Sequence, residues 1–231
     1  MIAVNEMFLR TQRDGLKPIT LMIQDIEYFG DTPGYRRFLE DLEFAAHSSG
    51  ADVVFPVGAH CVVTERGLFR DNPPRYYLPV GRLLNYPSAE DVPPLDFAAT
   101  IPGMPTVTHT AIALALFMGF SEIYLLGVDL DFIVNSTTPI RHGYGANPYN
   151  ENDRVPAAAL FANKMGWDYP TLLAEVADHL RSYARLHEIA ASSAQRLYNA
   201  NPGGLLETVE RRPYESLFQP PVSRRTLQGL P

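Results

Sequence analysis

The stretch that decides the fold is MGFSEIYLLGVDLD at residues 118–131. Its pattern is that of a helix end, a glycine turn, a short apolar strand and two aspartates. Residues 123–126 are continuously apolar, as in a parallel strand that helices cover on both faces. Ligands of open parallel sheets bind beyond the carboxyl ends of the strands. We therefore expect Asp129 and Asp131 to lie at a site, although either aspartate alone is equally well explained as a turn former.

Strand and helix patterns alternate on both sides of this stretch. The predicted strands lie near residues 2–4, 19–23, 53–57, 123–127 and 196–199, with a weaker one at 76–80. The predicted helices cover residues 34–48, 107–118 and 171–193. Residues 87–105 are rich in proline and are expected to be irregular. The alternation predicts an α/β fold with a Rossmann-like, mostly parallel sheet and helices on both faces.

The length of 231 residues and the hydrophobic content of 46% suit one α/β domain. We expect residues 1–218 to form this domain. A long polar segment at about 129–170 is expected to act as a lid or binding loop, because connections of this length are usually functional. Residues 219–231 are proline-rich and lack periodicity, so they are predicted to form an extended tail.

Composition excludes several classes of protein. The net charge of −7 and the pI near 5.3 argue against a broad nucleic-acid-binding surface. The single cysteine, Cys61, excludes an intrachain disulfide and favours a reducing compartment, and its simplest interpretation is a small buried residue. No apolar run reaches the ~18 residues of a membrane span, and the N-terminus lacks a signal-peptide pattern. We expect a cytoplasmic protein without a transmembrane segment.

Short polar side chains recur where the predicted strands end. Amide and carboxylate groups of this kind bind ribose hydroxyls, base edges or a metal. Hydroxyl groups also begin the predicted buried helix, whose free N–H groups can receive a phosphate, although a plain N-cap explains Thr106 equally well. The predicted nucleotide-binding residues are Asn5, Asp25, Thr106, Thr108, Asp129 and Asn199.

His142 lies between glycine and polar residues at 141–145, so it is the histidine least suited to a core. A loop histidine beside a nucleotide can act as a general base or acid, although most lone loop histidines have no such role. No histidine pair or cysteine cluster has metal-site spacing. The sequence also lacks the P-loop, G-x-S-x-G and G-x-G-x-x-G motifs. The commonest nucleotide fingerprints are therefore absent.

Three blocks of sequence, in order, resemble the 6-hydroxymethylpterin diphosphokinase MptE-like superfamily. This superfamily includes the bacterial motility accessory factors and is similar to the CMP-sialic-acid-dependent bacterial sialyltransferases. The blocks are Val4-Asn5-Glu6 with residues 18–25, Thr106-Val107-Thr108 with residues 119–129, and residues 197–207 followed by Arg211, Tyr214-Glu215 and Leu217-Phe218. The likeness covers most of residues 1–218.

The resemblance implies roles for individual residues. Asn5 and Asp25 would line a nucleotide pocket, with Thr106 and Thr108 near the phosphates. His142 would be the catalytic base of the sialyltransferase branch, and Tyr144 a neighbouring phosphate or acceptor contact.

The sequence also departs from the family pattern. Nothing before Asn5 matches the family's first strand and its Gly-x-Gly-Pro-Ser loop, which approaches the phosphates. We therefore expect a chain that lacks this unit, binds its donor weakly and self-associates as a homo-oligomer through an exposed sheet position.

Three functions stay open at this point. The first is glycosyl transfer from a CMP-activated nonulosonate to a small-molecule or glycan acceptor, which requires no cofactor. The second is diphosphoryl transfer from ATP to a hydroxymethylpterin, which needs Mg²⁺ and for which Asp129 and Asp131 are plausible ligands. The third is a degenerate, non-catalytic binding module, which the missing loop favours. His142 favours the first function, and analogy with the family places it slightly ahead.

Overall fold

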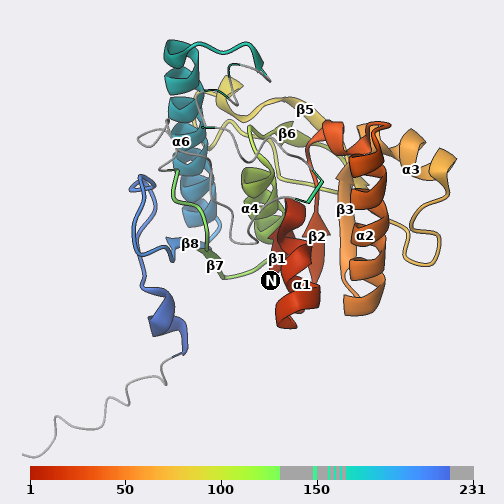
Figure 1. The fold of residues 1–231 in the computed structure, drawn as a ribbon. Helices are drawn as coiled ribbons and strands as arrows, with labels where there is room; N and C mark the ends of the chain where they lie inside the picture. Colours follow the sequence, from red (N-terminus) through yellow and green to blue (C-terminus); the bar gives the residue numbers. More distant parts are fainter. Residues whose placement is uncertain (131–147, 150–155, 157–158, 160–161, 163–164, 219–231) are drawn as a thin grey trace, which may run out of the picture.

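The computed structural model describes residues 1–130, 148–149, 156, 159, 162 and 165–218 (Figure 1). The α/β class is confirmed. A four-stranded parallel sheet has the order β1-β2-β3-β4 and consists of β1 (Ile2–Val4), β2 (Thr20–Met22), β3 (Asp52–Pro56) and β4 (Arg75–Tyr77). Two further parallel pairs are β5 (Pro79–Arg82) with β6 (Ile101–Gly103), and β7 (Glu122–Leu125) with β8 (Arg196–Asn199).

The three predicted helices are confirmed as α2 (Pro33–Ser49), α4 (Val107–Phe117) and α6 (Tyr169–Ser192). Thr32 caps α2 by accepting a hydrogen bond from the Tyr35 N–H at 3.2 Å, and Asp168 caps α6 in the same way through Thr171 at 2.9 Å. The sequence pattern did not predict two short helices, α1 (Phe8–Asp14) and α3 (His60–Arg66). Short 3-10 turns η1 (Asn5–Met7), η2 (Ile26–Phe29), η3 (Val57–Ala59), η4 (Leu83–Asn85) and η7 (Tyr214–Phe218) complete the described elements.

Helices cover both faces of the four-stranded sheet, as predicted (Figure 1). Successive side chains of a strand point to opposite faces, so each strand serves two cores. Leu21 and Phe55 pack with Phe8 of α1 and Phe38 of α2 on one face. Their strand neighbours on the other face pack with α4; this second core contains Met22, Val54, Tyr77, Val107 and Leu114.

The prediction that residues 123–127 and 196–199 belong to the same sheet as the N-terminal strands is wrong. Both segments are strands, but β7 and β8 pair with each other, and in the described residues neither is hydrogen-bonded to β1. A third core, which includes Ile112 and Leu116 of α4 together with Leu125, Leu186 and Leu197, packs these strands against α4 and α6. The shared helix α4 therefore joins the two sheets through side-chain packing. The predicted self-association at the exposed edge stays a prediction.

Residues 101–103 were expected to be irregular and instead form β6. The reason is that the backbones at Gly81 and Gly103 approach each other closely, which the proline content of residues 87–105 does not indicate. A Cβ atom on Gly103 would lie 2.5 Å from the Gly81 carbonyl oxygen, and Gly81 has a φ of +68°. The register shifts between Pro79 and Arg82, as at a β-bulge. Two glycines thus allow a pairing that larger residues would block.

Two further expectations concern single features. Cys61 is exposed, so its interpretation as a small buried residue is wrong; on α3 it is Val63 that points into the core. No helix in the described part of the chain is long and apolar enough to cross a membrane.

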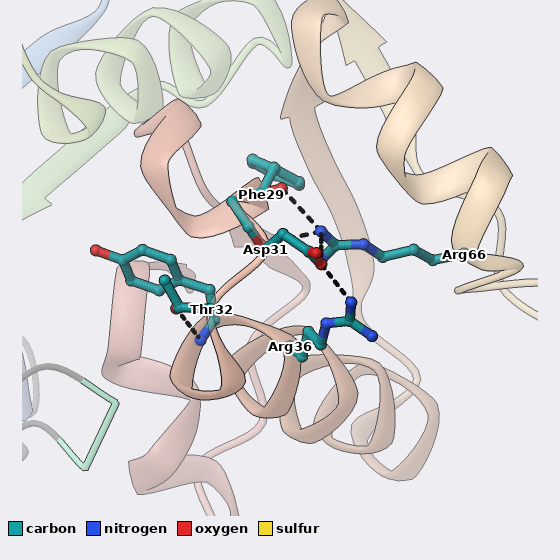
Figure 2. Close-up of polar contacts among 7 residues, drawn as sticks. Phe29, Asp31, Thr32, Arg36 and Arg66 are labelled. Atoms are coloured by element: carbon teal, nitrogen blue, oxygen red, sulfur yellow. Dashed lines mark hydrogen bonds and ion pairs between the residues drawn. The ribbon is translucent and has the colours of Figure 1, made fainter.

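Arg66 of α3 holds the turn between η2 and α2 (Figure 2). Its guanidinium donates to the carbonyl oxygens of Phe29 at 3.3 Å and Gly30 at 3.0 Å, and to the Asp31 carboxylate at 3.2 Å. Asp31 also pairs with Arg36 at 2.6 Å. One side chain therefore fixes the chain path that leads from the end of β2 into α2.

Replacement of Arg66 by Met should keep the aliphatic stem and remove all three hydrogen bonds. We expect the free energy of unfolding to fall by about 1–3 kcal/mol, because the charged donor is only 23% exposed. Denaturant unfolding measures this. The control is Arg37→Met, because the Arg37 side chain is 69% exposed and pairs with Asp41 on the surface. The prediction is contradicted if Arg37→Met changes the free energy of unfolding by more than about 0.5 kcal/mol, or if Arg66→Met leaves it unchanged.

Candidate functional site

The start of α4 lies against the carboxyl ends of β2 and β6, and Gln24 joins them. Its Nε2 donates to the Met104 carbonyl oxygen at 3.1 Å, just past β6. Its Oε1 accepts from the hydroxyl of Thr110 in α4 and from that of Tyr77, which ends β4, at 3.4 Å. The positive end of the α4 dipole is thereby placed at the strand edge where ligands of parallel sheets bind.

Asp25 follows Gln24 and is exposed at this edge. Burial raises the pKa of Tyr77, the Thr110 hydrogen bond opposes this, and the Asp25 carboxylate adds to the rise. Asp25 is also the residue that precedes η2.

Asn5 directly follows β1 and begins η1 in an unusual backbone conformation, with a φ of +47°. Its Oδ1 atom is buried and has no hydrogen-bond partner among the described residues. A buried amide oxygen without a partner is costly, so such an atom points to a ligand or to water. The next residue, Glu6, is 1% exposed and accepts a hydrogen bond from the Tyr28 hydroxyl. Asn5 therefore combines a fixed position with an available acceptor.

Thr106 and Thr108 lie half-buried at the start of α4. Burial raises the pKa of the Tyr183 hydroxyl of α6, and the side chains of Thr108 and Thr106 oppose that rise. Thr106 Oγ1 lies 2.7 Å from Nδ1 of His109, whose Nε2 lies 3.1 Å from the His179 carbonyl oxygen. Because a carbonyl only accepts, the Nε2 atom of His109 carries the proton and Nδ1 accepts from Thr106. Thr106 precedes α4 without capping it through its side chain.

His109 is completely buried. Its ring lies against the ring of Tyr183, with centroids 3.9 Å apart. Burial lowers the pKa of His109 to about 3, although the His179 carbonyl opposes that shift. The imidazole of His109 is therefore neutral at neutral pH.

Asp129 is exposed just beyond β7. Its carbonyl oxygen accepts from the Leu205 N–H at 2.6 Å, and a Cβ on Gly204 would collide with the same atom. Val128 belongs to the same hydrophobic core as Met104. Asp131, His142 and Tyr144 lie outside the described residues.

Asn199 points into the protein. It is fully buried, its Nδ2 donates to the Leu206 carbonyl at 2.8 Å, and its Oδ1 accepts from both the backbone and the side chain of Asn201. Asn201, which the pattern analysis did not single out, also joins Gly127 and Val128 to this network. The observed contacts of Asn199 therefore brace the β7 and β8 ends.

Arg211 donates to the carbonyl oxygens of Asn201 and Gly203, both at 2.6 Å, and of Gly204 at 3.3 Å.

Gln24 was not predicted as a site residue from the sequence. Its signal in the sequence is its place directly after an apolar strand and before Asp25.

Comparison of the chain with protein-family models, curated proteins and solved structures gives no match. The resemblance to the MptE-like superfamily thus rests on the residues alone. Among the residues that the structure describes, no group of three or more His, Cys, Asp or Glu side chains is arranged to hold a metal ion.

The buried neutral His109 should make stability depend on pH. Its folded pKa of about 3 lies below the ordinary value of 6.5, so the unfolded chain binds a proton first as the pH falls. Stability contributed by the neutral form is present above pH 6.5 and is lost towards pH 3, at about 1.4 kcal/mol per pH unit. We expect His109→Gln to remove that slope in urea unfolding measured across this range. An unchanged slope would contradict the assignment, and His47→Gln, an exposed histidine, is the control.

Proposed function

We propose that this chain is a cytoplasmic glycosyltransferase-like protein with a Rossmann-like domain, which uses a CMP-activated nonulosonate in bacterial surface glycan synthesis. The observation that supports this most is the position of the start of α4 against the strand ends, through Gln24, Met104 and Thr110. The family resemblance supplies the choice of donor.

The chemistry of the strand edge suits a nucleotide. The Oδ1 of Asn5, which has no hydrogen-bond partner among the described residues, can accept from the cytosine amino group or a ribose hydroxyl. The exposed Asp25 carboxylate can accept from ribose hydroxyls. The first free N–H groups of α4 can bind the phosphate, whose negative charge the helix dipole favours. As the glycosidic bond breaks, CMP leaves with its phosphate carrying more charge, and the same N–H groups stabilise it.

The acceptor hydroxyl must lose its proton as it attacks the sugar carbon. We assign that step to His142, whose place among glycine and polar residues suits a general base. Tyr144 is proposed as its neighbour at the phosphate or acceptor. This scheme uses no metal.

The second candidate is a diphosphokinase-like reaction with ATP and Mg²⁺. The exposed Asp129 beyond β7 favours it, because carboxylates at this edge can bind Mg²⁺ between themselves and the phosphates. Asp131 would be the second carboxylate. A non-catalytic binding module is the remaining alternative.

Asn5→Gly tests the nucleotide site without disturbing the backbone, since glycine adopts positive φ readily. We expect CMP affinity, measured by calorimetry without metal, to fall by about 3- to 10-fold with the loss of one hydrogen bond. The fold should keep its melting temperature to within a few degrees. The control is Ala194→Gly, another residue at positive φ (+56°). Binding of ATP only with Mg²⁺ would favour the diphosphokinase, and no nucleotide binding would contradict both enzymes.

His142→Ala tests the catalytic base. We expect turnover with a CMP-nonulosonate to fall by roughly 10²- to 10⁴-fold while CMP affinity stays nearly unchanged, because the base acts on the acceptor. Steady-state kinetics and calorimetry separate the two effects. His60→Ala, which changes a histidine at the start of α3, is the control. Unaltered turnover would remove His142 from the mechanism.

A further inference from the structure

A pocket of about 830 Å³ opens between α6, the segment after β5 and the loop that leads from β6 to α4. Residues that line it include Arg82, Tyr86, Met104, Arg181, Ser182 and Arg185. Its volume is in the range of small-molecule sites. It adjoins the start of α4, because Met104 and Pro105 belong to its wall, but it lies on the α6 side of that helix.

The wall of this pocket is held in place by Arg185. Its guanidinium donates to the carbonyl oxygens of Tyr86 at 2.7 Å and Pro87 at 3.0 Å, and it pairs with Glu188 at 3.2 Å. Its side chain is only 15% exposed. Below the same segment, Leu83 is 1% exposed in the core. Arg185 therefore fixes the 82–87 segment against α6, and the pocket has a preformed wall.

Two other guanidinium groups of the pocket donate to no backbone carbonyl in the part of the chain that the structure describes. Arg82 makes no ion pair with any residue that the structure describes, and Arg181 pairs with Asp178 on the surface of α6. The lining holds three arginines against the carboxylates of Asp178 and Glu188. The pocket is thus net positive in a chain with a net charge of −7. Guanidinium forks of this kind recognise carboxylate and phosphate groups.

Ser182 adds a buried hydroxyl to the wall. The residue is completely buried, and its Oγ has no hydrogen-bond partner among the described residues. Helical serines often donate to the carbonyl four residues earlier, which this one does not. A buried hydroxyl without a partner is a cost in the free protein, and a hydroxylated ligand would satisfy it.

We infer that this pocket is a second binding site, for a small polyhydroxylated molecule that carries a phosphate or carboxylate group. Arg82 and Arg181 receive the oxyanion, and the Ser182 hydroxyl contacts the hydroxylated part. This inference does not depend on the strand-edge nucleotide site. Sugar phosphates and sugar acids share the required chemistry.

Calorimetric titration of the full chain with ribose 5-phosphate, gluconate and ribose tests the inference. Ribose 5-phosphate or gluconate should bind at least about 10-fold more tightly than ribose, because only they carry the oxyanion. Whichever binds more tightly identifies the phosphate or the carboxylate as the preferred group. Equal binding of ribose, or no binding of either anion, overturns the proposal.

Variants locate the binding. Arg82→Gln should weaken the anion by about 10- to 100-fold, the range for a charge-assisted hydrogen bond. Ser182→Ala should weaken it by about 3- to 10-fold without lowering the melting temperature. Arg75→Gln is the control, since Arg75 is exposed on β4 and outside the pocket. Equal effects of Arg82→Gln and Arg75→Gln would overturn the site.

Competition with CMP separates this site from the nucleotide site. Saturating CMP and the Asn5→Gly variant should both leave ribose 5-phosphate binding unchanged. If CMP fails to bind but ribose 5-phosphate responds to Arg82→Gln, the proposed glycosyltransferase function fails and the pocket stands. If CMP displaces ribose 5-phosphate, or Arg82→Gln abolishes CMP binding, the pocket belongs to the nucleotide site and the second site is overturned.

Discussion

The hydrogen bonds of Gln24 are the constraint that sets how α4 lies at the carboxyl ends of β2, β4 and β6. One amide binds the hydroxyl groups of Thr110 and Tyr77 and the carbonyl oxygen of Met104, so it connects β2, β4, β6 and α4. An amide can do this because its oxygen accepts twice while its nitrogen donates. Replacement by an apolar residue would leave several partly buried groups without partners. The position of α4, and hence of any anion site at its start, follows from this contact.

Helix α4 packs against two sheets at the same time. It packs on the four-stranded sheet through Val107 and Leu114, and on β7 and β8 through Ile112 and Leu116. A helix covered on opposite sides has little polar surface, which explains its nearly continuous apolar sequence. Hydrogen bonds run from Thr106 through the buried His109 ring to the His179 carbonyl. These hydrogen bonds require a neutral histidine, and they tie the start of α4 to α6.

The sequence predicted the elements well and their connections less well. Apolar periodicity located β1, β2, β3, β7 and β8 within a residue or two, because burial on both faces imposes it. The periodicity does not reveal which strands pair. Strand β7 is not paired with β1 in the described residues, and β5 pairs with β6 at Gly81 and Gly103. Both facts depend on how closely the backbones of residues distant in the chain approach each other. Asn199 shows the same limit: a polar residue at a strand end can bind a ligand or brace a loop, and only its contacts with Asn201 and Leu206 distinguish the two.

By itself the sequence determined the α/β class, the parallel direction of the strands and the positions of the main strands and helices. These properties follow from local periodicity and from the alternation of strands and helices along the chain. The tertiary structure alone decided that Gln24 links the carboxyl ends of the strands to α4, that Asn5 has a buried oxygen without a partner among the described residues, and that three arginines line one pocket. Each of these depends on distances between residues far apart in sequence, which packing sets and composition does not encode.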